Sequence, residues 1–536
     1  MARALAPAVP PLTAALESRA PRLHAKLDTG LVKSSAIAIL ALSFWSAAYA
    51  QSPAKLIPAP RFWNDRDLAD WATPVAGLNV RPAHFSEKEY YAAPIGDYLR
   101  TYPVYFPGRE PAGFWQMLKN AKPEPLVRIG ARTQALWIAT GERVFRELDQ
   151  PSTRRYDRKF LEILQSREAL AKLGVAEPKN GILPVLRLVP TAKGLEVSLS
   201  DCARCHSRTL PDGRILPGAS TGVISDTYTS PAFFSLFYSI APEGSNPESS
   251  SNDEPPGMAR WRQSAVPWVE NDIHESLKSM TPDDQRALNT NTAGIVARFN
   301  GSPFFPTKVP DLIGIRDRKY LDHTATHRLR DITDVMRYMA LVSCCDVGDF
   351  GPYHMLPVEQ RTIRGRFSND LLFALAEYLF ALKAPANPNA GDARAKAGEN
   401  IFWREGCPEC HTPPLYTSNK LTLAAGFQPP PDHPLRGDIL PLSVGTDLSL
   451  ALKTRKGTGL YKIPSLKGVW YRALLNHDGS VSTLEEWFDP ARLNNDYVPS
   501  AFIGYKLTHR AVPGHEFGLK LGAEDKARLI AFLRTL

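Results

Sequence analysis

The sequence predicts a mainly α-helical protein of two related units, with long loop-rich elaborations around the first unit. Two segments, Asn369–Lys383 and Glu524–Leu536, carry apolar residues at three- and four-residue spacing, the pattern of amphipathic helices. Two further segments share a glycine and a phenylalanine four residues apart, at Gly141–Phe145 and Gly398–Phe402, each at the start of a helical pattern. Each such pattern leads towards a C-x-x-C-H pentapeptide. These three observations predict a duplicated helical plan.

The units are expected at residues 131–385 and 386–536, joined by a proline-rich linker at residues 384–391. Phe145 precedes the first pentapeptide by 57 residues, whereas Phe402 precedes the second by five, so the first unit contains a large insertion. Residues 51–130 are rich in proline and aromatic side chains without a clear period, and we expect them to wrap around the units.

The two pentapeptides carry the chemistry. They are Cys202-Ala-Arg-Cys205-His206 and Cys407-Pro-Glu-Cys410-His411. In this pattern the two thiols attach a haem covalently and the histidine becomes the proximal iron ligand. A four-thiolate zinc site is the alternative. Because both cysteine pairs carry the histidine at the same offset, we expect two covalently bound haem c groups.

The N-terminus resembles an export signal. Lys33 precedes an apolar run from Ala36 to Trp45, and the small-residue pattern at residues 48–50 follows it. The apolar run is too short to cross a bilayer. We therefore expect a signal peptide over residues 1–50, with a long basic region, cleavage after Ala50, and a periplasmic or secreted protein without a transmembrane anchor.

The amino-acid composition limits the expected binding partners. The formal net charge of +9 is a mild excess for 536 residues and no basic run occurs, so nucleic acid is not an expected partner. Two cysteines, Cys344 and Cys345, are adjacent and lie outside the pentapeptides. In an oxidising compartment they are expected to form a vicinal disulfide or to remain buried thiols, with a structural role.

The candidates for the sixth ligand of the second haem can be reduced by exclusion. The last methionine of the chain is Met355, so the second unit cannot form a His/Met haem from its own residues. His515, in a loop before the last helix, is the preferred candidate, and His477 is the alternative. His433 and His509 are further candidates. Bis-His ligation lowers the reduction potential, which suits an electron relay.

The first haem is expected to keep an open or weakly occupied sixth position. No histidine lies between His206 and His274, and other ligands (Met258, Met280, His274, His323, His327) could reach the iron only through the fold. We expect Tyr320, His323 and His327 to line its pocket as catalytic residues, with the two histidines four residues apart on one helix face. A solvated or capping role is the alternative for these histidines.

With these residues in view, the chain resembles the dihaem c-type enzymes that include bacterial cytochrome c peroxidases, MauG and the RoxA-type rubber oxygenases. The stretch from Tyr461 to Val469 and the following His477-Asp-Gly-Ser resemble the peroxidase signature. The stretch Leu99–Tyr105, the large spacing between the pentapeptides, and residues 309–314 and 317–328 resemble RoxA-type cytochromes more closely.

The resemblance implies two cytochrome c-like haem domains, a first haem that binds dioxygen, and a bis-His second haem. The chain departs from the family in two ways. It is shorter than RoxA, which puts a polymer-binding surface in doubt. Arg472 and Leu474 replace the Thr-x-Pro of the peroxidases, which argues against an interhaem calcium.

We therefore expect an exported dihaem oxidoreductase whose first haem activates dioxygen or peroxide. The second haem would relay electrons from a small redox partner through Trp470 or Tyr471. An isoprenoid-like substrate would need an apolar pocket, for which Phe304, Phe305 and Tyr320 are candidates. One alternative is a dihaem cytochrome c peroxidase with His323, His327 or Glu270 as acid/base residue. Another is a non-enzymatic electron-transfer cytochrome with both irons six-coordinate.

Overall fold

A computed structural model of the chain describes residues 55–536, apart from residues 201, 211, 221–232, 234–235, 237–257, 290–293, 297–301, 346 and 473. The expected signal peptide at residues 1–50 lies outside the described residues. Leu56–Leu536 group into one unit by their contacts. Within the described residues no helix combines the length and apolar character needed to span a membrane.

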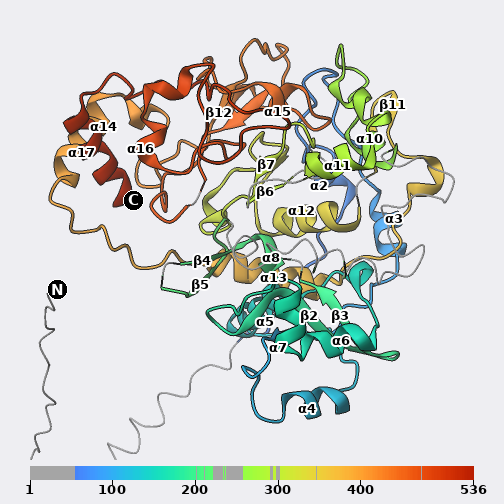
Figure 1. Cartoon of the computed structure of the whole chain (residues 1–536). Helices are drawn as coiled ribbons and strands as arrows, with labels where there is room; N and C mark the ends of the chain where they lie inside the picture. Colours follow the sequence, from blue (N-terminus) through green and yellow to red (C-terminus); the bar gives the residue numbers. More distant parts are fainter. Residues whose placement is uncertain are drawn as a thin grey trace, which may run out of the picture. The chain divides into compact units, whose positions relative to one another are not determined.

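Two helix pairs organise this unit (Figure 1). Helix α5 (Gln134–Glu147) packs against α13 (Asn369–Ala381), and α14 (Ala395–Arg404) packs against α17 (Ala523–Arg534). Both expected terminal helices, α13 and α17, are thus present close to their predicted bounds. Each is paired with the helix that carries the repeated glycine and phenylalanine.

The two pairs make the same close contact. A Cβ atom on Gly141 would overlap the backbone carbonyl of Ala374, and one on Gly398 would overlap the carbonyl of Arg528. One turn further along, Phe145 lies against Tyr378 with ring centroids 5.5 Å apart, and Phe402 lies against Phe532 at 5.3 Å. The glycine lets two backbones approach, and the aromatic pair packs beside it.

The N-terminal segment packs on helix α12 (Ile332–Cys344). Arg337 of this helix is buried and donates to the carbonyl oxygen of Phe62, while its guanidinium pairs with Asp67 at 2.6 Å. Trp63 is also buried and stacks on Tyr90, with ring centroids 4.6 Å apart. Asp67 lies in the short helix α2 (Asp65–Leu68), and Tyr90 lies in α3 (Glu87–Ala92).

The insertion before the first pentapeptide contains a sheet. Three antiparallel strands pair in the order β1 (Tyr102–Tyr105), β2 (Ile182–Thr191) and β3 (Gly194–Leu199). The helices around it are α4 (Phe114–Asn120), α6 (Arg158–Leu164) and α7 (Arg167–Lys172). The prediction of a mainly α fold is therefore corrected to mixed helix and sheet. Leu195, Val197 and Leu199 alternate with other residues along β3, the pattern of a paired strand.

Short elements complete the described residues. Two-stranded antiparallel sheets pair β4 (Ser207–Thr209) with β5 (Ile215–Pro217), β6 (Ile295–Val296) with β7 (Thr307–Lys308), β8 (Tyr320–Leu321) with β9 (His327–Arg328), β10 (Asp349–Phe350) with β11 (Tyr353–His354), and β12 (Leu421–Leu423) with β13 (Leu460–Lys462). Short helices are α8 (Cys202–Cys205), α10 (Met258–Ser264), α11 (Pro282–Asn289), α15 (Ser449–Leu452) and α16 (Leu484–Trp487). The 3-10 turns are η1 (Pro151–Thr153), η2 (Ile273–Lys278), η3 (Ile315–Asp317), η4 (Val358–Gln360), η5 (Cys407–Glu409), η6 (Arg436–Asp438) and η7 (Pro490–Leu493). Cys345, which ends α12, is buried and disulfide-bonded.

Candidate haem sites

Both pentapeptides form a single helical turn. Cys202–Cys205 is helix α8, and the N–H of His206 donates to the carbonyl oxygen of Cys202. Cys407–Glu409 is η5, and the N–H of His411 donates to the carbonyl oxygen of Cys407. The four cysteines of the pentapeptides form no disulfide. The turn brings both thiols and the histidine of each motif together, as covalent haem attachment requires.

Both motif histidines are oriented by a proline carbonyl. The Nδ1 atom of His206 lies 3.0 Å from the carbonyl oxygen of Pro310, and that of His411 lies 3.1 Å from the carbonyl oxygen of Pro464. The carbonyl of Tyr416 is a second partner of His411, at 3.2 Å. A carbonyl oxygen can only accept, so Nδ1 carries the proton in both rings. This is the tautomer in which Nε2 binds a metal.

A second histidine lies opposite the second motif. The ring centroids of His411 and His515 are 6.3 Å apart. A metal–nitrogen bond of about 2 Å to each ring places the centroids of two imidazoles on one metal about 6 Å apart. The Nδ1 atom of His515 is buried and has no hydrogen-bond partner among the described residues. Burial, followed by the proximity of His411, lowers the pKa of His515 to about 4, so the ring is a neutral, ligand-competent imidazole. These residues fit a bis-ligated haem iron.

The His515 loop is held by a buried arginine. Arg492 donates to the backbone carbonyls of Val512, Gly514 and His515, the last at 3.0 Å. The N–H of His515 donates to the carbonyl of Val444 at 2.6 Å. His515 has a φ of 51°, a left-handed conformation that is uncommon outside glycine. The fixed carbonyls stabilise this conformation and so set the direction of the imidazole.

The other candidate ligands of the second haem have different surroundings. His477 is buried with its ring 4.9 Å from that of Tyr461, and its Nδ1 lies 2.9 Å from the side-chain oxygen of Asn476. His433 accepts the backbone N–H of Leu435 at its own Nδ1. Among the described residues, His515 is the histidine whose ring contacts that of His411.

A duplicated segment, which the sequence analysis missed, holds both motif histidines. Residues 308–323 and 462–477 align without a gap at a constant offset of 154 residues. The two copies share seven identical positions: Lys308/Lys462, Pro310/Pro464, Leu312/Leu466, Gly314/Gly468, Arg318/Arg472, Leu321/Leu475 and His323/His477. Both glycines have a positive φ, and so do Asp322 and Asn476 at another equivalent position. The constant offset is the signal that could have revealed the duplication.

The two copies exchange equivalent hydrogen bonds. The N–H of Lys308 donates to the carbonyl of His477 at 2.9 Å, and the N–H of Lys462 donates to the carbonyl of His323 at 3.0 Å. This reciprocity is the signature of a pseudo-two-fold arrangement. The offset also relates Asn369 to Ala523, the first residues of α13 and α17. At the same offset, the counterpart of His515 is Arg361.

A polar contact joins the two copies beside the prolines. The carboxylate of Asp311 accepts from Nε of Arg472 at 2.8 Å and from the hydroxyl of Tyr471 at 3.1 Å. Arg472 also donates to the carbonyl of Ser465 at 2.6 Å. Because Asp311 follows Pro310 and Ser465 follows Pro464, one arginine links the supports of the two motif histidines.

The aromatic pair expected as a relay lies in the same region. Trp470 and Tyr471 form an edge-to-face pair with centroids 5.2 Å apart. Tyr471 packs in a cluster with Leu216 and Ala219, in the chain just after the first motif. The pair therefore lies where the second copy of the duplicated segment meets the first haem motif.

The expectation that His323 and His327 share one helix face is wrong. Tyr320 and Leu321 form strand β8, which pairs with His327 and Arg328 in β9. Asp322 and Ala325 have positive φ values in the turn between them. The turn geometry places His323 and His327 in separate surroundings.

Each of the three residues expected to be catalytic has structural partners. Nε2 of His323 lies 3.1 Å from the carbonyl of Lys308, and burial lowers the pKa of His323 well below its usual range. His327 is buried with its ring 4.2 Å from that of Trp71. The hydroxyl of Tyr320 donates to Asp438. Their catalytic roles stay predictions.

Other pocket residues expected from the sequence belong to a different contact. His274 is fully buried, with Nδ1 2.6 Å from Asp272 and Nε2 2.6 Å from the hydroxyl of Ser302. Both ring nitrogens are thus engaged by the protein. The rings of Phe304 and Phe305 pack against His274, with centroid distances of 5.7 and 6.3 Å.

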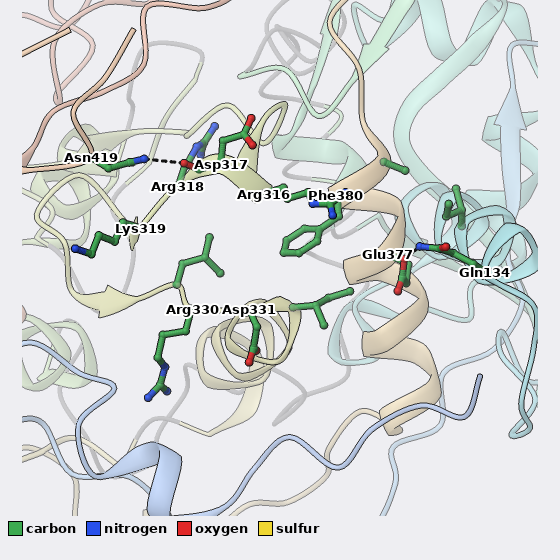
Figure 2. Close-up of a pocket in the computed structure, with 14 residues that line it drawn as sticks. Gln134, Arg316, Asp317, Arg318, Lys319, Arg330, Asp331, Glu377, Phe380 and Asn419 are labelled. Carbon is green, nitrogen blue, oxygen red and sulfur yellow. Dashed lines mark hydrogen bonds between the residues drawn. The ribbon is translucent and has the colours of Figure 1, made fainter. Parts of the chain in front are cut away.

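A cavity of about 640 Å³ lies between helix α13 and the loop of residues 316–319 (Figure 2). Most of the residues that line it are polar or charged: Gln134, Arg316, Asp317, Arg318, Lys319, Arg330, Asp331, Glu377 and Asn419. Ile138, Leu329, Ile332, Phe380 and Ala381 complete the wall. The expected trio of Tyr320, His323 and His327 does not line this cavity. Its volume suits a small molecule or part of a cofactor, and its charged groups favour an anionic one.

One curated protein and three solved structures are similar to parts of the chain. No protein-family model matches the chain. The chain is 29% identical over 171 residues to the Cytochrome-c peroxidase IdrP1 of Pseudomonas sp. (strain SCT), a match that covers 28% of this chain and 42% of the relative. The chain therefore spans less than half the length of that relative. The similarity supports a relationship to haem-dependent peroxidases.

Three solved structures are similar in part. They are hydrazine synthase of Kuenenia stuttgartiensis (15% identity, TM-score 0.28, covering 54% of this chain and 95% of that one), a MauG-like protein associated with microbial copper homeostasis (19%, 0.21, 31% and 56%), and a variant of the diheme peroxidase BthA from Burkholderia thailandensis (16%, 0.23, 48% and 77%).

Proposed function

We propose that the chain is an exported dihaem c-type oxidoreductase in which the first haem reduces peroxide or activates dioxygen and the second relays electrons. The observation that carries the proposal is the equivalent support of His206 and His411, each held at Nδ1 by the proline carbonyl of one copy of the duplicated segment. Cys202 with Cys205 and Cys407 with Cys410 would hold the two haems. Bound haem supplies an iron that cycles between oxidation states.

The two irons are proposed to differ in their sixth ligand. His515 lies opposite His411 and supports bis-His ligation of the second iron. The equivalent position in the first unit is Arg361, whose guanidinium donates to the carbonyl of Leu356 and lies 3.5 Å from Asp349. Arginine does not ligate iron, because it stays protonated. An open sixth position on the first iron is therefore the natural counterpart of a filled one on the second.

Peroxide is the oxidant that we favour for the first haem. The relative of this chain is named a cytochrome-c peroxidase, and the lining of the described cavity is charged rather than apolar. Reduction of hydrogen peroxide to two waters consumes two electrons and two protons. A small reduced redox protein would supply the electrons, and the second haem would pass them on through the region of Trp470 and Tyr471.

The test uses the holoprotein purified from an exporting host. We expect two haems per chain, one low-spin and unreactive towards cyanide, one high-spin and cyanide-binding, in absorption and EPR spectra. Peroxide should be consumed when a reduced small cytochrome is present. Oxygenated products from an isoprenoid panel with dioxygen would instead favour the oxygenase. Two low-spin haems that bind neither cyanide nor CO would overturn the enzyme proposal in favour of an electron carrier.

A further inference from the structure

The duplicated segment gathers cationic side chains between the two motifs. Lys308 and Lys462 occupy equivalent positions, and so do Arg318 and Arg472. Each lysine lies two residues before the proline that orients a motif histidine. Lys308, Lys462 and Arg318 are half-buried, and burial lowers the pKa of each.

Most of these cations lack a carboxylate partner. Arg472 pairs with Asp311 at 2.8 Å. In the part of the chain that the structure describes, no carboxylate oxygen lies within 4.0 Å of Lys308, Lys462 or Arg318. Nζ of Lys308 donates to the carbonyl of Leu474 at 2.9 Å, and Arg318 donates to the carbonyl of Ile313 at 3.1 Å.

The nearby carboxylates interact with other residues. Asp478 pairs with Arg510, a further cation of this region. Asp322 accepts the hydroxyls of Tyr338 and Thr326. Lys462 makes no hydrogen bond through Nζ to any described residue. The polypeptide thus leaves a net excess of positive charge in an enclosed space, where an unpaired charge is costly.

The excess positive charge affects the pKa values of the two lysines. Burial lowers the pKa of Lys308 to about 8 and that of Lys462 to about 7, and the neighbouring arginines add to the effect. An anion among these groups would raise both pKa values again, because an opposite charge favours the protonated lysine. Of the four cations, Arg318 also lines the cavity of about 640 Å³.

We propose that Lys308, Arg318 and Lys462, with Arg472, form a carboxylate-binding centre that is filled by propionates of the attached haems. The source of the carboxylates rests on the proposed function. The need for an anion rests only on the geometry of the cations. Both haems would then place carboxylates in one cluster of cations. A change in the charge of this cluster would therefore change the reduction potentials of both irons.

The experiment measures the reduction potentials of both haems by spectroelectrochemistry in the holoprotein. Lys308→Met and Lys462→Met are compared with Lys520→Met, an exposed control. Loss of a cation beside a propionate disfavours the reduced, more negative haem. Each variant should therefore shift at least one potential downwards, the double variant should shift both, and Lys462→Arg should restore the wild-type value. The variants should also acquire a pH dependence near neutrality, because an unpaired propionate binds a proton more readily.

Two other outcomes are decisive. If acetate or chloride shifts the wild-type potentials and the variants lose that response, the site binds a free anion and the propionate assignment is overturned. If haem content and potentials equal those of wild type in all variants, the lysines are neutral structural groups and the centre does not exist. Haem content by pyridine haemochrome and thermal unfolding are measured in parallel. A wild-type protein without two haems would overturn the proposed function instead.

Discussion

The two haem-motif units share a frame and differ in what lies around it. Both cross a helix pair at a glycine, and both hold the motif histidine with a proline carbonyl from the duplicated segment. The second unit reaches its motif five residues after Phe402, while the first reaches its motif 57 residues after Phe145, with the β2–β3 hairpin in between. The second unit places His515 where the first has Arg361.

The comparison shows how the same helix pair and proximal histidine support can accompany two different sixth positions. The proximal side is fixed by backbone carbonyls, which tolerate sequence change, so it stays alike in both copies. The distal side depends on one loop residue before the last helix, so a single substitution there changes what the iron can bind. In the second unit Arg492 holds that loop through three carbonyls. Under the proposed function, the distal loop would decide which haem does the chemistry and which relays electrons.

The largest expected effect comes from breaking the distal contact. His515→Ala should convert the second haem from low-spin to high-spin, make it bind cyanide, and raise its reduction potential, because a strong axial donor is lost. Absorption and EPR spectra of the holoprotein measure all three changes. His509→Ala, at an exposed histidine, is the matched control. A low-spin, cyanide-inert second haem in His515→Ala would assign the ligand to another residue, with His477 the next to test.

Much of this arrangement could be predicted from residue patterns, and the failures have physical causes. The pentapeptides and the terminal helices could be predicted because they depend on local spacing. His515 became a candidate ligand because the last methionine is Met355, which leaves the second unit with histidines as candidates. The β8–β9 hairpin was missed because its register depends on strand pairing and on positive φ at Asp322 and Ala325, which periodicity does not encode.

The duplicated segment escaped for a different reason. Its seven identical positions are spread over sixteen residues, so the similarity is weak to the eye. The two copies contact each other through backbone hydrogen bonds between residues far apart in the chain, which the sequence does not show. The exchange between Lys308 and His477, and between Lys462 and His323, joins residues that are far apart in the chain. The sheet in the first insertion was missed because Tyr102 of β1 pairs with Leu188 of β2, which lies far away in the chain.

An intermediate effect should come from filling the helix crossings. Gly141→Ala and Gly398→Ala each force a methyl group against a carbonyl of the partner helix. Each should lower the free energy of unfolding by about 2 kcal/mol, because overpacking outweighs the gain in helix propensity. Urea unfolding followed by circular dichroism measures the loss. Gly391→Ala, which meets no atom within 4 Å, should leave stability nearly unchanged. A loss in one variant only would show that the two crossings are not equivalent.

The smallest effect concerns the contact between the two copies. The hydroxyl of Tyr471 donates to Asp311 at 3.1 Å, whereas the equivalent position in the first copy is Asp317 and makes no such contact in the described part of the chain. Tyr471→Phe keeps the ring and removes the hydrogen bond, so the free energy of unfolding should fall by about 1 kcal/mol. Tyr156→Phe, at an exposed tyrosine, should change nothing. Since Arg472 still holds Asp311, both haem potentials should stay at their wild-type values; a shift in the first haem alone would show that the hydroxyl, rather than the arginine, positions the Pro310 carbonyl on His206.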